Sequence, residues 1–349
     1  MTAMMKVKLL QPEDEKRWDA FVDADSQGTI FHKIAWKRVI GATFPYKPYY
    51  LLAERGEALC GVLPLFHVHT MFSGNALIST PFAVYGGILA KDREAESALF
   101  EATKEHARQL SANYIELRER YSKPNEQLQT RDSLYVTFLR RIEKSAEANF
   151  KLLPREARRL VRKSEAGGLS GQRSRRVGDL KTFYHIYAAS VRHLGTPVFP
   201  YYMFENCLNF LQDDADLLLI YHLDKPVAGV LSFYYRDIVL PYYGGALPEE
   251  RAPSPNNYMY WHLMREAGAR GYAWFDFGRS KSDTGAYNFK RHMGFEPTPL
   301  HYQYYMVNGA AIPSNNPTNP KFKMAIETWR HLPLAVTKIL GPKLVKAFP

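Results

Sequence analysis

Two stretches of the chain repeat the same order of hydrophobic and polar positions. Residues 53–65 read AERGEALCGVLPL and residues 221–233 read YHLDKPVAGVLSF, so each predicts a polar turn followed by an apolar strand containing Gly-Val-Leu. In each copy another predicted strand ends in Tyr-Gly-Gly, at residues 85–87 and 243–245. The repeated order predicts a duplicated unit; the alternative is that two ordinary hairpins match by chance.

Each Tyr-Gly-Gly is followed by a predicted helix, at residues 93–110 and 257–269, and then by a strand in NYIELRE or GYAWFDFG. We therefore expect one domain over residues 1–148 and a second over 150–310. A chain of 349 residues suits two domains, each large enough to bury a core.

The last part of the chain, residues 311–349, changes in composition. The stretch AAIPSNNPTNPKFK predicts a turn-rich linker, because prolines and asparagines interrupt regular structure. The stretch WRHLPLAVTKILGPKLVKAFP contains no acid, and four cations accompany its apolar residues: Arg330, Lys338, Lys343 and Lys346. We expect a helix that packs across the domain junction with its lysines toward water; a membrane-surface helix is the alternative.

The chain is basic, with 46 lysines and arginines against 35 acids, a net charge of +11 and a pI near 9.4. This balance favours phosphate-bearing partners or an anionic membrane surface over cationic partners, and does not choose between these two. Cys60 and Cys207 lie in apolar segments, which indicates buried thiols in a reduced compartment. No apolar run suits a signal peptide or a membrane span, so we expect a cytoplasmic protein, with peripheral contact at the inner membrane through the basic C-terminal helix as the variant.

A predicted helix in LLPREARRLVRKSEAGG has a basic face that includes Arg158 and Arg162. This face is either a solvated surface or a contact for the phosphates of tRNA or of a nucleotide-linked substrate. In SVRHLGTPVFPYYMF, Gly195 suits a helix end and the prolines predict a rigid aromatic loop. The loop predicts either a pocket wall, with Arg192 and Tyr202 as candidate contacts, or an aromatic cap on the core.

The segment FDFGRSKSDTGAYNFKRHMGFEP, residues 275–297, is the main candidate site. Asp276 ends a buried strand, where a carboxylate must be paired or used; it is a weak candidate base, and a structural role in the loop is the alternative. In the following helix the angular positions direct Lys290 toward the strand and Arg291 away from it. With the loop cations Arg279 and Lys281, Lys290 is our candidate for contact with an oxyanion or a phosphate.

Several other chemistries lack their motifs. The chain has no G-x-x-x-x-G-K-[ST], G-x-G-x-x-G, H-E-x-x-H or G-x-S-x-G sequence. His67 and His69 share one side of a strand, but we identify no third protein ligand. We therefore predict no metal and no tightly bound cofactor.

The chain resembles the acyltransferase fold of the GNAT superfamily in its order of elements: a polar-turn hairpin, a strand, a helix, the strand FDFG, a helix ending in FKRHMGFEP and a closing strand HYQYYMV. Two such units in tandem resemble the FemA/FemB/FemX family. The details SVRHLGTPVFP, FDFGRSKSDTG and NPTNPKF are most similar to the FemAB-like branch associated with exosortase (PEP-CTERM) and exopolysaccharide gene clusters. The resemblance implies an α/β (α+β) fold with two tandem domains, each a mixed sheet flanked by helices, and a C-terminal helical tail. It also implies that Lys290, in Phe-Lys followed by Gly294-Phe295, contacts phosphate or the reacting carbonyl, and we add Tyr243 as a candidate substrate contact.

The resemblance implies an acyl- or aminoacyltransferase that acts on an amine of a cell-envelope peptide or saccharide precursor, nucleotide- or lipid-linked. Acyl-CoA or aminoacyl-tRNA is the expected co-substrate. The chain departs from the family pattern in having neither room for the long helical arm of some tRNA-dependent members nor the Q/R-x-x-G-x-G/A loop of CoA-dependent enzymes. The alternatives are a non-catalytic module that binds RNA or an anionic glycan, and a CoA-dependent N-acetyltransferase acting on a small amine.

Overall fold

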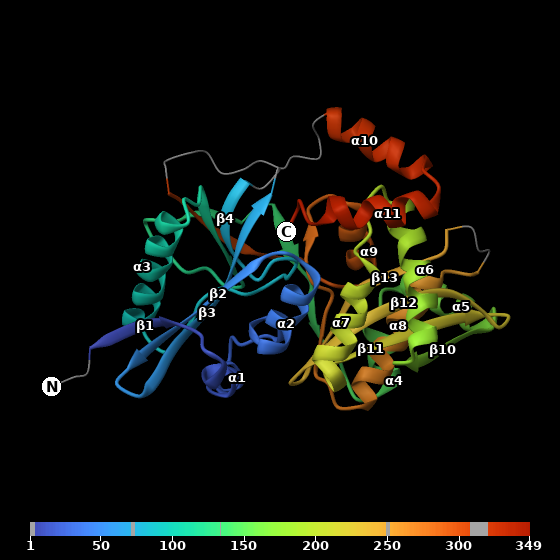
Figure 1. The fold of residues 1–349 in the computed structure, drawn as a ribbon. Coiled ribbons are helices and arrows are strands. Elements are labelled where there is room, and N and C mark those ends of the chain that lie inside the picture. Colours follow the sequence, from blue (N-terminus) through green and yellow to red (C-terminus); the bar gives the residue numbers. More distant parts are fainter. Residues whose placement is uncertain (1–3, 71–73, 133, 249–251, 308–319) are drawn as a thin grey trace. The chain divides into compact units, whose positions relative to one another are not determined.

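The computed structural model describes residues 4–70, 74–132, 134–248, 252–307 and 320–349 (Figure 1). The chain forms two compact units. Unit 1 contains Met1–Ser133, Leu300–Asn315 and Lys346–Pro349, and unit 2 contains Leu134–Pro299 and Asn316–Val345. Most of the predicted linker, residues 310–319, lies outside the described residues.

Unit 1 has an eight-stranded sheet in the order β1-β2-β3-β4-β6-β17-β7, with β5 paired to β3. The strand pairs are antiparallel except β4 and β6, which are parallel. The strands are β1 (Met5–Leu9), β2 (Lys47–Arg55), β3 (Ala58–Thr70), β4 (Gly74–Ser79), β5 (Leu89–Ala90), β6 (Tyr114–Glu119), β7 (Gln129–Arg131) and β17 (His301–Met306); the helices are η1 (Pro12–Asp14), α1 (Glu15–Ala24), η2 (Ile30–His32), α2 (Ile34–Thr43) and α3 (Arg93–Gln109).

Unit 2 has a six-stranded sheet in the order β10-β11-β12-β13-β14-β9 and a small sheet in the order β15-β8-β16. The strands are β8 (Tyr135–Thr137), β9 (Leu139–Arg141), β10 (Leu169–Ser174), β11 (Ala215–His222), β12 (Lys225–Tyr235), β13 (Ile238–Ala246), β14 (Trp274–Asp276), β15 (Ser280–Lys281) and β16 (Thr298–Pro299). The helices are α4 (Ala146–Leu152), α5 (Arg155–Ala166), α6 (Val177–His193), α7 (Tyr201–Leu211), η3 (Gln212–Asp214), α8 (Pro255–Ala269), α9 (Gly285–His292), α10 (Pro320–His331) and α11 (Leu334–Val345).

The predicted internal repeat corresponds to one motif in both units. An antiparallel hairpin (β2-β3 or β11-β12) leads to a third strand, then to a helix (α3 or α8) and to a strand parallel to the third (β6 or β14). The predicted α/β class, with mixed sheets flanked by helices, is confirmed. One detail differs: residues 243–245 lie in β13, whereas residues 85–87 form a loop after β4.

In each unit the strand that pairs with the outer side of the motif lies beyond the predicted domain boundary. Strand β17, near residue 300, pairs antiparallel with β6 of unit 1, and β9, near residue 140, pairs antiparallel with β14 of unit 2. The predicted ranges 1–148 and 150–310 treat each domain as continuous and therefore differ from the two units in these segments. The hydrophobic pattern predicts a strand but does not specify which sheet it joins.

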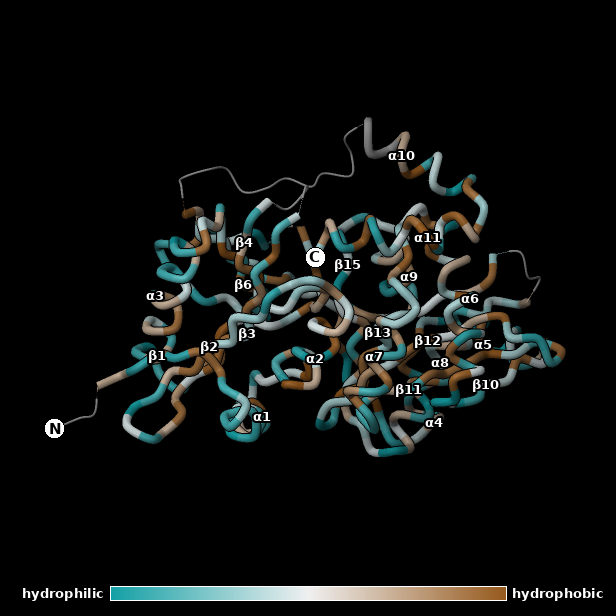
Figure 2. Tube along the Cα trace, in the orientation of Figure 1, coloured by the Kyte–Doolittle hydropathy of each residue, from teal (hydrophilic) through white to brown (hydrophobic). Residues whose placement is uncertain are grey.

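Two adjacent glycines show how helices cover the sheet of unit 2. A Cβ added to Gly244 would lie 2.9 Å from the Tyr260 hydroxyl of α8, and one added to Gly245 would lie 2.5 Å from Ser190 Cβ of α6. Because consecutive strand residues point to opposite faces, α8 and α6 cover opposite faces of this sheet. In Figure 2 hydrophobic segments of the tube occur in the central strands of both sheets.

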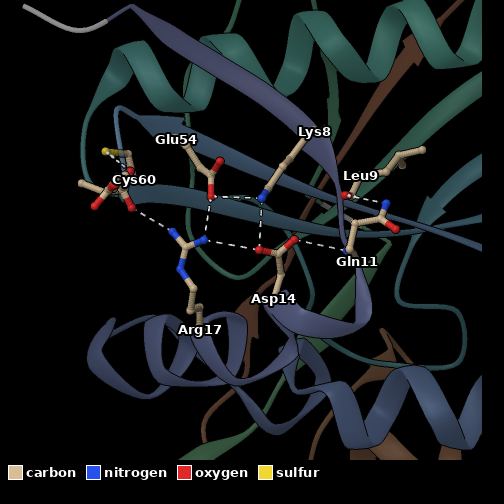
Figure 3. Close-up of polar contacts among 9 residues, drawn as sticks. Lys8, Leu9, Gln11, Asp14, Arg17, Glu54 and Cys60 are labelled. Carbon is tan, nitrogen blue, oxygen red and sulfur yellow. Dashed lines mark hydrogen bonds and ion pairs between the residues drawn. The ribbon is translucent and has the colours of Figure 1, made fainter.

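An ion-pair cluster joins β1, η1, α1 and β2 in unit 1 (Figure 3). Asp14, which is buried, accepts from Lys8 Nζ at 3.1 Å and from Arg17 at 3.3 Å. The same two cations approach Glu54 Oε1 at 3.4 and 3.0 Å. Because each carboxylate meets two cations, the buried charge of Asp14 is compensated.

Candidate functional site

The candidate site in unit 2 begins where β13 and β14 separate. These strands pair in parallel at two positions, Ile238 with Trp274 and Val239 with Phe275. Beyond this point β13 continues along β12 to Ala246, with a register shift opposite Leu231 and Ser232. Alternate peptide groups of residues 240–246 therefore point away from β12, on the side that β14 has left.

Lys290 of α9 is buried and fastens the loop that follows β14. Its Nζ donates to the backbone carbonyls of Phe277, Gly278 and Arg279 at 2.8, 3.0 and 3.2 Å. These three bonds use all three N–H groups of the ammonium. The neighbouring Arg291 is exposed, so the predicted difference in direction between these two cations is present.

Burial sets the electrostatics of Lys290. Desolvation lowers the pKa of its ammonium to about 7, Asp276 opposes this change, and Arg279 adds to it. A buried amine with a lowered pKa is typical of functional sites, although structural contacts also produce it. Here the three carbonyl contacts indicate that Lys290 positions the loop.

Asp276 also holds the start of this loop. Its Oδ1 accepts from the Gly278 amide at 2.8 Å and from Thr137 Oγ1 at 3.2 Å. Gly278 has a φ of +63°, which glycine adopts without the steric cost that a side chain would bring. These contacts are those of a structural carboxylate, the alternative given above for this residue.

Arg279 and Lys281 are the half-buried cations of the loop. The Arg279 guanidinium lies 4.6 Å from the centre of the Tyr135 ring, and Lys281 Nζ lies 5.8 Å from the same centre. Burial, followed by the charge of Arg279, lowers the pKa of Lys281. The structure thus brings two positive charges to one aromatic ring.

Tyr243 of β13 brings a buried hydroxyl to the same region. The side chain is 6% exposed, and its hydroxyl has no hydrogen-bond partner among the described residues. Burial raises the pKa of this hydroxyl far above its usual value, and Arg279 is close enough to oppose that effect. The ring packs against Phe199 from the predicted aromatic loop, with centroids 5.3 Å apart. An unsatisfied buried hydroxyl calls for a partner, and a bound ligand would supply one.

Ser280 is a candidate that the sequence analysis missed. It lies between Arg279 and Lys281 in β15, is buried, and its hydroxyl likewise has no partner in the described part of the chain. Its place between two loop cations was a signal available in the sequence. Its burial, however, depends on the pairing of β15 with β8, which could not be predicted.

The other predicted contacts lie on different elements. Arg192, near the end of α6, donates to the Leu332 carbonyl at 3.3 Å, and Tyr202 of α7 is 47% exposed. Arg158 and Arg162 lie on α5, where Arg162 is exposed and stacks on Phe150. These four residues thus lie on α5, α6 and α7 and not on the loop of residues 277–281.

The described residues contain no group of three or more metal-ligating side chains. His67 Nε2 bonds to Asn75 at 2.5 Å, and both cysteines are free and buried. In the parts of the chain that the structure describes, no helix is long and apolar enough to cross a membrane.

Comparison with known proteins places this arrangement in a recognised fold. Residues 153–291 match the family model described as "Acetyltransferase (GNAT) domain". They include Tyr243, Asp276, Arg279, Lys281 and Lys290. No curated protein matches the sequence.

Three solved structures share the fold over most of the chain. A FemX structure is 18% identical, with a TM-score of 0.68, covering 87% of this chain and 98% of its own. The structure of L-PGS from Bacillus licheniformis is 11% identical, with a TM-score of 0.57, covering 96% and 98%. A tandem GNAT protein from the clavulanic acid biosynthesis pathway is 11% identical, with a TM-score of 0.56, covering 88% and 100%. The fold is therefore that of a tandem GNAT protein.

Proposed function

We propose that unit 2 is an acyltransferase, which moves an activated acyl or aminoacyl group onto an amine of a cell-envelope peptide or saccharide precursor. The observation that carries this proposal is the separation of β13 from β14 beside the unpartnered Tyr243 hydroxyl and the loop fastened by Lys290. The match of residues 153–291 to a GNAT domain supports the same reaction class.

The reaction requires a bond from the acceptor nitrogen to the acyl carbon, and loss of the bond from that carbon to the ester oxygen or thioester sulfur of the donor. The amine loses a proton and the leaving group gains one. Arg279 and Lys281 would stabilise negative charge on the carbonyl oxygen or on a donor phosphate, and outward peptide N–H groups of residues 240–246 would donate to the carbonyl. Lys290 acts through the loop, because its N–H groups already donate to carbonyls.

The donor and acceptor classes rest on resemblance and charge. Two of the similar structures are of proteins named FemX and L-PGS. The third is a structure, without AcCoA, of a tandem GNAT protein. Aminoacyl-tRNA and acyl-CoA are accordingly the two donors to test. The net charge of +11 suits either one, since both carry phosphates. The link to exosortase and exopolysaccharide systems comes from the sequence resemblance alone.

Tyr243→Phe tests the site directly. Removing an unsatisfied buried hydroxyl should leave the thermal midpoint unchanged or raise it. The free energy of unfolding should increase by at most about 1 kcal/mol. The same change should reduce transfer and the stabilisation by the donor, because the ligand loses a hydrogen bond. Tyr121→Phe, at a tyrosine of unit 1 that is 50% exposed, is the control and should alter none of these quantities.

The assay is a thermal-shift panel of acyl-CoAs, charged tRNA and nucleotide-linked peptides, followed by a transfer assay with each ligand that binds. A donor that stabilises wild type and Tyr243→Phe equally would exclude Tyr243 from the site. Binding without transfer to any amine acceptor in the panel would instead support the non-catalytic binding module.

A further inference from the structure

Helix α11 is apolar on almost every side. Its residues 334–345 read LAVTKILGPKLV, in which Thr337, Lys338 and Lys343 are the polar ones, and Figure 2 shows hydrophobic segments along it. One face is buried, with Thr337, Gly341 and Val345 at helical spacing, and the helix contacts α6. A Cβ added to Gly341 would lie 2.8 Å from Val198, so this contact is close. This face is covered by unit 2.

The opposite face of α11 is also apolar, but it is exposed. Ile339 lies about 200° around the helix from Gly341 and is 65% exposed. Leu340 and Leu344 are 39% and 37% exposed. A helix that is hydrophobic all round is normally buried on all sides, so the outward face of α11 has the composition of an interface.

The chain that carries this face has charges of one sign after Glu327, which pairs with Arg330 at 3.1 Å. Residues 328–349 contain four lysines and arginines and no acid. Lys343 is exposed beside Leu340 and Leu344, whereas Lys338 is half-buried over the ring of Tyr184, and burial lowers its pKa. Exposed leucines and isoleucines next to lysines, without acids, are the composition of helices that lie in the surface of anionic bilayers.

We propose that the outward face of α11, formed by Ile339, Leu340, Lys343 and Leu344, binds the surface of an anionic lipid bilayer. The helix has 12 residues, too few to span the hydrocarbon layer, so it would lie along the surface. Its apolar side chains would enter the boundary between headgroups and acyl chains, and Lys343 would reach the phosphates. A second copy of the chain fits this face less well, because two-fold pairing would oppose cation to cation.

The proposal is tested by flotation of the full-length protein with vesicles of phosphatidylcholine, with and without phosphatidylglycerol. Wild type should float with the anionic vesicles and much less with the neutral ones, and salt should weaken the binding. Ile339→Glu should reduce the bound fraction at least about tenfold, because it removes an apolar contact and adds a repelled charge. Val177→Glu is the control. It makes a comparable change at an exposed side chain, 62% exposed, at the start of α6, and this variant should bind the vesicles like wild type.

Equal flotation of Ile339→Glu and Val177→Glu, or no flotation of wild type, would overturn the proposal. So would a wild-type dimer in sedimentation that Ile339→Glu converts to a monomer, because a second copy would then cover the face. Both substitutions are at exposed positions, and unchanged thermal midpoints would show that the fold is kept. Transfer of a soluble acceptor should be unaffected by Ile339→Glu, so this result is separate from the test of the proposed function.

Discussion

Replacing Lys290 by methionine removes the ammonium that fastens the loop of residues 277–279 while keeping an unbranched side chain of similar length. Two opposing contributions to the free energy of unfolding are removed together. The lowering of the lysine pKa from 10.5 to about 7 corresponds to about 5 kcal/mol against the charged form. Three hydrogen bonds from a charged donor contribute about 1.5 kcal/mol each or somewhat more. Near neutral pH the net change should therefore be small, within about 2 kcal/mol.

The pH dependence separates these contributions. The folded-state pKa lies below the unfolded one, so the unfolded chain binds more protons above about pH 7, and the free energy of unfolding of wild type rises with pH. Relative to Lys290→Met, which does not titrate, wild type should gain about 1.4 kcal/mol per pH unit up to about pH 9. Conversely, this contribution is lost as the pH falls through about 7.

The measurement is urea unfolding of both proteins over this pH range, with transfer activity measured in parallel. Activity of Lys290→Met should fall strongly, because Arg279 and Lys281 lie on the released loop. Arg291→Met, at the exposed neighbour, is the matched control and should change neither activity nor the pH dependence. A difference between wild type and Lys290→Met that stays flat from about pH 7 to about pH 9 would refute the lowered pKa.

Two predictions concern the polar interior of unit 1. Burial lowers the pKa of His32 to about 4, where its Nε2–H donates to the Gly87 carbonyl at 3.0 Å and Nδ1 accepts from Thr29 at 2.8 Å. Wild type should therefore lose up to about 3 kcal/mol relative to His32→Gln as the pH falls from about 6.5 to about 4, and parallel pH curves from urea unfolding would contradict this. Gly87→Ala would place a Cβ 2.2 Å from the carboxyl carbon of buried Glu119 and should cost about 2 kcal/mol in urea unfolding. Gly41→Ala, in α2 with open space around it, should instead raise the free energy of unfolding by about 0.5–1 kcal/mol. Equal effects of the two alanines would show that Glu119 moves aside without cost and would contradict the prediction for Gly87.

Local periodicity predicted the helices of the repeat well. The ranges 93–110 and 257–269 correspond to Arg93–Gln109 and Pro255–Ala269. The helical angle also gave the inward direction of Lys290 and the outward direction of Arg291. These features depend on residues close in sequence, where side-chain direction follows from the turn of one helix.

The contacts at the site depended on distant parts of the chain and could not be predicted. The carbonyl partners of Lys290 converge because Gly278 adopts a positive φ and Asp276 holds its amide. The missing partner of Tyr243 is a property of the packed unit, since only the surroundings determine whether a buried hydroxyl is satisfied. In the same way, an isolated three-residue strand such as β9 contains no signal for the sheet that it joins.

The positions of β9 and β17 in the sequence determine how the protein can be divided into fragments. In chain order residues 134–299 of unit 2 are inserted between β7 and β17 of unit 1 and separate two parts of one sheet, and residues 316–345 of unit 2 follow β17. A fragment ending near residue 148 would leave β6 as an open edge, since its antiparallel neighbour lies at residues 301–306. Residues 134–299, by contrast, include every strand of both unit 2 sheets in one continuous piece. Residues 134–299 are thus the part that keeps its sheets when excised, without α10 and α11, whereas unit 1 needs residues 1–133 and 300–315 joined to close its sheet.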